Sequence, residues 1–212
     1  MIRVLLIDSH VLVRDGLRRL LEDRGEFAIA GAVADGREAV AFLRRRAADV
    51  ALVAVNVPEI GVVEGMLRLR RYHPGVGLIL LTEHVNFAVP RGWARRVVAG
   101  FLSKDAPVDE VAAAIREVAA GRRFVGGDLA RRWALDRLDG DAGAAFRELS
   151  QRELQVLLLV AQGKSVGEIS DRLCLSPKTI HTYRQRLRGK LGVRSEVEMV
   201  RLAHHHGMLG DV

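Results

Sequence analysis

The chain has 212 residues, of which 49% are hydrophobic and 28% charged, and a formal net charge of +7. This composition excludes a fibrous or wholly disordered chain, and the length suits two modest domains. No apolar run is long enough to span a bilayer, the start Met1-Ile2-Arg3-Val4 is unlike a signal peptide, and a single cysteine excludes an internal disulfide. We therefore expect a cytoplasmic protein without a membrane partner, with Cys174 in a core, and the positive charge suits an anionic partner.

The first half alternates short apolar runs with amphipathic stretches, which is typical of a parallel sheet covered by helices on both faces. Five strands are predicted, at residues 3–7, 28–33, 50–55, 77–81 and 100–102. Helical spacing of apolar residues predicts helices around residues 12–21 and at 37–46, 63–71 and 108–120. A helix between Val85 and Val97 is weakly indicated, because Pro90 and Gly92 interrupt it. These elements predict an α/β fold with a doubly wound, five-stranded parallel sheet.

The pattern loosens between Gly121 and Ala145, where glycines flank a short amphipathic piece that contains Trp133. We interpret this stretch as a linker. The predicted organisation is a first domain at 1–124, a linker at 125–146 and a second domain at 147–212.

Beyond the linker, the sequence contains only helix signals. Ser150 with Glu153 and Ser165 with Glu168 have the spacing of capping boxes, and Ser176-Pro177 supplies an N-cap followed by proline. Gly163 and Gly192 suit left-handed helix ends. With a last helix at 195–206, the second domain is predicted to be all-α, with four helices.

A short helix, a tight turn and a longer basic helix form the helix-turn-helix arrangement, whose second helix enters the major groove of double-stranded DNA. Between Ser176 and Arg194 there are six basic residues and no acidic one. We expect the following to approach bases or nearby phosphates: Lys178, Thr179, Thr182 and Arg186. Arg184, Arg188 and Lys190 are expected mainly to counter phosphate charge, while Ile180, Tyr183, Leu187 and Leu191 form the apolar seam.

Several segments of this half resemble the LuxR-type DNA-binding domain. They are Leu149-Ser150-Gln151-Arg152-Glu153, Ala161-Gln162-Gly163-Lys164-Ser165, Leu175-Ser176-Pro177-Lys178-Thr179-Ile180 and Lys190-Leu191-Gly192-Val193. The resemblance implies a homodimer on a two-fold symmetric DNA site, formed through the last helix, where we single out Glu196, Met199, Val200 and Ala203. Many members of that family carry asparagine where this chain has Val166, a change that removes a polar contact and keeps the fold.

The first half is similar to the receiver domain of response regulators of the NarL/FixJ group, which have a flavodoxin-like strand order. Receiver chemistry needs clustered carboxylates for Mg²⁺, an acceptor aspartate, a hydroxyl and a lysine. Asp8, Thr82 and Lys104 match three of these positions, while Ser9 stands at the second acidic position and Ala54 at the acceptor position. The resemblance therefore implies an atypical receiver of a two-component system that is not controlled by aspartyl phosphorylation and holds neither metal nor cofactor.

With those carboxylates missing, we expect Asp8 to be the partner of Lys104, which would hold the pocket in one state without a phosphoryl group. The alternative is a decayed pocket in a domain kept as a dimerisation surface. A protein or a small ligand at the receiver is a further alternative signal, since doubly wound sheets bind ligands at the carboxyl ends of their strands.

The sequence also bears on functions other than DNA binding. An enzyme is not expected, because the sequence has no Walker-type phosphate loop, no nucleophile elbow and no paired carboxylates at Asp8. The run His204-His205-His206 is not expected to bind metal, because consecutive helical residues point about 100° apart. An auxiliary protein that heterodimerises with another regulator stays open as the alternative function.

Overall fold

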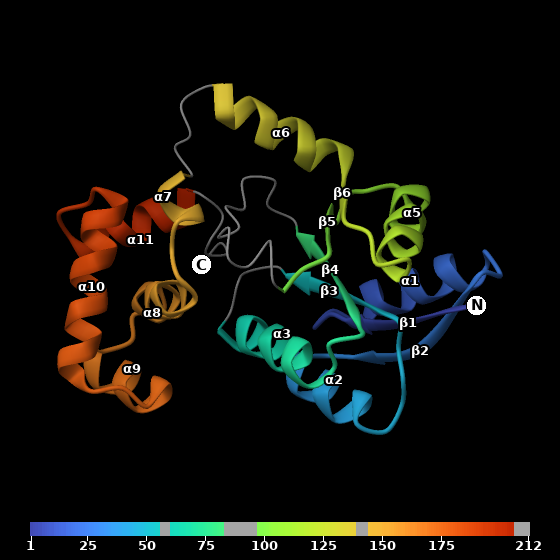
Figure 1. Cartoon of the computed structure of the whole chain (residues 1–212), viewed down its shortest axis with the longest axis horizontal. Helices are drawn as coiled ribbons and strands as arrows, with labels where there is room; N and C mark the ends of the chain where they lie inside the picture. The colour runs from blue at the N-terminus through green and yellow to red at the C-terminus, as the bar shows by residue number, and fades with distance from the viewer. Residues whose placement is uncertain (56–59, 83–96, 139–143, 206–212) are drawn as a thin grey trace. The chain divides into compact units, whose positions relative to one another are not determined.

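The computed structural model describes residues 1–55, 60–82, 97–138 and 144–205 (Figure 1). The chain divides into two compact units, and the boundary falls between Ala134 and Leu135. The first unit holds every strand of the described residues and the second holds helices alone. No helix within the described ranges is both long enough and apolar enough to cross a membrane.

The first unit is built on a parallel sheet. Its strands are β1 (Ile2–Ile7), β2 (Phe27–Val33), β3 (Val50–Val55), β4 (Gly77–Thr82), β5 (Gly100–Ser103) and β6 (Phe124–Val125), in the order β2-β1-β3-β4-β5-β6. The predicted doubly wound sheet of five strands is confirmed. The short sixth strand, which pairs with β5, was not predicted. Two residues are too few to show the alternation of apolar and polar side chains that marks a strand.

Helices α1 (Val11–Glu22), α2 (Gly36–Leu43), α3 (Ile60–Tyr72) and α5 (Val108–Ala119) flank the sheet (Figure 1). Helix α1 packs against α5, and Arg24, two residues after the end of α1, forms an ion pair with Asp109 of α5. Side chains alternate along each strand, so Val4, Leu6 and Leu52 join one buried cluster with Ile115 of α5. The weakly indicated helix between Val85 and Val97 falls almost wholly outside the described residues.

Helix α5 lies very close to β4 at Gly77. A Cβ atom added there would lie 2.3 Å from Cγ1 of Val118, a distance that real Cβ atoms do not reach. Glycine at this position therefore allows the helix to pack directly on the strand.

The stretch interpreted as a linker is partly helical. Helix α6 (Gly127–Leu138) and the short α7 (Ala144–Arg147) occupy much of it. At the start of α6, Oε1 of Glu110 accepts a hydrogen bond of 2.7 Å from the N–H of Gly127. The glycines of this segment suggested a loop, and the sequence did not reveal that a glutamate from α5 satisfies the helix start.

The second unit contains α8 (Gln151–Ala161), α9 (Val166–Leu173), α10 (Pro177–Leu191) and α11 (Glu196–His205). Both predicted capping boxes are present, with Ser150 and Glu153 at α8 and Ser165 and Glu168 at α9. Gly163 and Gly192 adopt φ values of 73° and 66°, as expected for left-handed helix ends.

The expectation that Cys174 is a core residue is wrong. Cys174 is exposed and ends α9 in the left-handed conformation, with φ of 53°. The tight turn into α10 directs this side chain to solvent, whereas the neighbouring Leu173 is buried.

Candidate functional site

Helices α9 and α10 form a helix-turn-helix whose second helix presents an exposed polar face. The opposite face packs against α8 and α9. Ile180, Leu187 and Leu191 of the predicted seam are buried, and Tyr183 is half-buried. This packing fixes which side of α10 is available to a partner.

The first turn of α10 is held by its own hydroxyl groups. Oγ of Ser176 accepts a hydrogen bond of 3.2 Å from the N–H of Thr179 and lies 2.8 Å from Oγ1 of Thr179. Oγ1 of Thr182 donates to the carbonyl oxygen of Lys178 at 3.0 Å. The hydroxyl groups of Thr179 and Thr182 are therefore both engaged by groups of the first turns of α10.

The exposed face of α10 carries most of the residues selected from the sequence. Lys178, Thr182, Arg186 and Arg188 are exposed, and Thr179 is half-buried. His181 and Gln185 lie on the same exposed face and were missed, although they follow Lys178 by three and seven positions and the helical repeat could have identified them. Both carry hydrogen-bonding groups that suit base edges.

Arg184 and Lys190 are engaged inside the second unit. The guanidinium group of Arg184 forms an ion pair with Glu196 of α11, and its side chain is only 14% exposed. Nζ of Lys190 lies 2.8 Å from Oε2 of Glu153 in α8 and 3.3 Å from the carbonyl oxygen of Glu148. These two residues therefore join α10 to its neighbours, and their expected role in countering phosphate charge stays a prediction.

Glu153 is the buried centre of one of these connections. Burial raises the pKa of Glu153, but hydrogen bonds from Lys190 and from the N–H and hydroxyl of Ser150 outweigh it and lower the pKa below its ordinary value. The carboxylate thus stays charged and connects the start of α8 to the end of α10.

The residues chosen for a dimerisation helix divide between two faces of α11. Met199 and Ala203 are 0% exposed, so these two calls are corrected: they pack within the unit and cannot contact a second chain. Glu196 pairs with Arg184, and Val200 is half-buried. The outward face instead carries Val197, which is 68% exposed, together with Arg201 and His204. The regular spacing of apolar residues could not tell a core-facing stripe from a dimer-facing one.

The receiver pocket is centred on Asp8, which follows β1 and is 3% exposed. Its Oδ1 accepts a hydrogen bond of 2.8 Å from the N–H of His10 and lies 3.1 Å from Nδ1 of the same residue. Nζ of Lys104 lies 3.6 Å from Oδ2, so the expected Asp8–Lys104 pairing is confirmed. The guanidinium group of Arg14 donates to the carbonyl oxygen of Asp8.

The remaining pocket residues lie on neighbouring strands. Ala54 of β3 is in register with Leu81 of β4, next to Thr82, and the N–H of Lys104 donates to the carbonyl oxygen of Thr82 at 2.8 Å. Thr82 is buried, whereas Ser9 is exposed. Asp8 is consequently the one carboxylate among the five residues selected for this pocket, which is a poor set of ligands for Mg²⁺.

Groups of three or more metal-ligating side chains do not occur together in the described part of the chain. His206 lies outside that part, so the histidine run as a whole is not described. His204 is exposed on α11.

Comparison with known proteins places both units in recognised families. Residues 4–116 match the response regulator receiver domain, and residues 147–203 match the bacterial regulatory proteins of the luxR family. The response regulator UvrY of Escherichia coli (strain K12) is 40% identical over 209 residues, which cover 98% of this chain and 96% of UvrY. The response regulator GacA of Pseudomonas aeruginosa is 37% identical over 210 residues, 99% of this chain and 98% of GacA.

A solved structure has the same architecture. RcsB from Salmonella enterica serovar Typhimurium, bound to the promoter rprA in the presence of the phosphomimetic BeF₃⁻, matches with a TM-score of 0.76. The match covers 95% of this chain and 97% of RcsB at 22% identity, and so concerns the fold alone.

Proposed function

Because the chain belongs to the bacterial response regulators, with a receiver domain followed by a luxR-family domain, we propose that it is a sequence-specific DNA-binding transcription regulator. The observation that carries the proposal is the exposed face of α10, where Lys178, Arg186 and Arg188 stand beside hydrogen-bonding side chains. RcsB, which shares the fold, is bound to promoter DNA in its structure.

In this proposal α10 enters the major groove and α9 crosses the phosphate backbone. Lys178, Thr182 and Arg186 contact base edges, with His181 and Gln185 on the same face, and Thr179 contacts a base or a nearby phosphate. Arg188, farther along the helix, counters phosphate charge. Arg184 and Lys190 are also proposed to counter phosphate charge, and their ion pairs with Glu196 and Glu153 connect α10 to its neighbours.

The active species is proposed to be a homodimer on a two-fold symmetric site. Val197 and Arg201 form the outward face of α11, on which a second copy of the helix packs. Glu196 and Val200 border this face. A symmetric pair of α10 helices then fits half-sites about 34 Å apart, one turn of the DNA.

Control of this regulator is proposed to be independent of aspartyl phosphorylation. Ala54 has a methyl group at the acceptor position, and a methyl group cannot form an acyl phosphate. The ammonium group of Lys104 is already 3.6 Å from Asp8, an arrangement that fixes the pocket without a phosphoryl group. A protein or a small molecule that acts on the receiver would replace phosphorylation as the signal.

Selection from a random DNA duplex library tests the proposal. The purified full chain, with no donor added, is expected to enrich a two-fold symmetric site, and the variant Arg186→Ala is expected to lose that enrichment. Failure of the purified chain to select any site, with selection only in a mixture with another regulator, would replace the proposal by the auxiliary heterodimer.

A further inference from the structure

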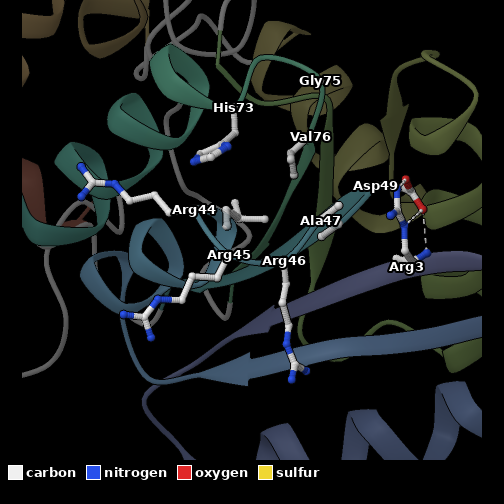
Figure 2. Close-up of a pocket in the computed structure, with 11 residues that line it drawn as sticks. Arg3, Arg44, Arg45, Arg46, Ala47, Asp49, His73, Gly75 and Val76 are labelled. Atoms are coloured by element: carbon white, nitrogen blue, oxygen red, sulfur yellow. Dashed lines mark hydrogen bonds and ion pairs between the residues drawn. The ribbon is translucent and has the colours of Figure 1, made fainter.

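A second candidate site lies at the amino edge of the sheet, the edge opposite the Asp8 pocket. A cavity of about 530 Å³ opens between the end of α2, the start of β3 and the loop before β4 (Figure 2). Leu43, Ala48 and Val76 line it as nearly buried apolar side chains. Its size falls within the usual range of small-molecule sites, about 300–1,000 Å³.

The charges that line this cavity are strongly unbalanced. Its lining includes four arginines and one histidine but a single carboxylate, Asp49. Asp49 is fully occupied by Arg3, whose Nη2 lies 2.6 Å from Oδ1 and whose Nε donates to Oδ2 at 3.1 Å. This fork holds the pKa of Asp49 below its ordinary value, so the carboxylate does not balance any further arginine.

The other three arginines, Arg44, Arg45 and Arg46, are consecutive and exposed. None of them forms an ion pair with a carboxylate of the described residues. They follow the last residue of α2, where cations are favourable, but a helix end supplies only about half an elementary charge. The helix end therefore compensates at most about half the charge of one of these arginines and leaves most of the positive charge uncompensated.

His73 adds an unpaired polar atom to the same wall. Its Nε2 is buried and has no hydrogen-bond partner among the residues that the structure describes. Figure 2 shows the His73 ring among the lining side chains, while the guanidinium groups of Arg44, Arg45 and Arg46 point outward in different directions.

We propose that this cavity binds a small molecule that carries two or more phosphate groups and is the size of a nucleotide. Arg44, Arg45 and Arg46 are long, exposed and unpaired, and turn inward to bind phosphate oxygens in the bidentate manner of guanidinium groups. The apolar side chains of Leu43 and Val76 receive the uncharged part of the ligand.

Calorimetric titration of the full chain with pyrophosphate and with ADP, at physiological salt, tests the proposal. Both are expected to bind, ADP more tightly because it also covers the apolar part of the cavity, and adenosine alone only weakly. Equal affinity for ADP and pyrophosphate would overturn the inference that the ligand has the size of a nucleotide. No binding of either probe would overturn the site.

Variants separate this site from general attraction to a basic protein. R44Q/R45Q/R46Q is expected to weaken pyrophosphate binding by about tenfold or more, the scale of losing charge-assisted hydrogen bonds. R18Q/R19Q/R131Q removes the same charge from exposed positions on α1 and α6 and is expected to leave the affinity nearly unchanged. Equal losses in the two variants would overturn the proposal.

Discussion

Lys104 and Asp8 form an ion pair at the carboxyl edge of the receiver sheet, with 3.6 Å between Nζ and Oδ2. Both side chains are largely removed from solvent, at 11% and 3% exposure. Oδ2 has no hydrogen-bond partner within the described residues, so the lysine charge is its main compensation. The pair brings the acidic position and the lysine position of the pocket into contact.

Removing the lysine is therefore expected to destabilise the receiver. Lys104→Met leaves a buried carboxylate without its cation, which costs about 3 kcal/mol of unfolding free energy. Asp8→Asn in the same chain should restore part of the loss, because the buried charge is gone. Urea denaturation of the single and double variants measures both effects, and equal stability of K104M and the unchanged chain would show that the pair contributes nothing.

The second unit is expected to lose stability in acid through Glu153. Its folded-state pKa lies below the ordinary value of 4.5, so the contribution is complete above that pH and is lost as the pH falls through the folded pKa. Glu153→Gln should cost about 1–3 kcal/mol at neutral pH and flatten the acid dependence. Urea titrations followed by circular dichroism from pH 7 to pH 3 measure this, and parallel curves for the two proteins would refute it.

Two arginines on α10 are expected to behave differently. Arg186→Ala removes an exposed group and should weaken specific DNA binding by about 1–3 kcal/mol with little change in melting temperature. Arg184→Ala removes the partner of Glu196. Its main effect should therefore be a lower melting temperature, and not a direct loss of DNA affinity. Fluorescence anisotropy with a selected duplex, alongside thermal melts, separates the two, and the opposite pattern would reverse the roles given to these residues.

The outward face of α11 provides a test of the homodimer. Val197→Glu places a charge on the 68% exposed position and should break the dimer without unfolding the unit. Met199→Ala, in contrast, leaves a cavity in the core and should cost about 2–5 kcal/mol. Sedimentation of both variants with and without DNA distinguishes them. A V197E protein that still binds DNA as a dimer would place the interface elsewhere.

The sequence predicts the fold well where the signal is local. Alternating apolar runs locate the five long strands, and Ser150, Ser165 and Ser176 mark three helix starts, because capping depends on residues three positions apart. Prediction from the sequence fails where a helix start or the partner of a side chain depends on residues that are distant in the sequence. The start of α6 depends on Glu110, and the roles of Arg184 and Lys190 depend on acidic residues in other helices.

DNA binding by this chain is expected not to depend on a phosphoryl group. The affinity of the full chain for its selected duplex is determined with and without Mg²⁺ and a small-molecule phosphodonor, beside S9D/A54D, which restores the two missing carboxylates. We predict the same affinity in both conditions for the unchanged chain and a donor-dependent change for S9D/A54D alone. A donor-dependent rise in affinity of the unchanged chain would contradict the account and require another acceptor residue.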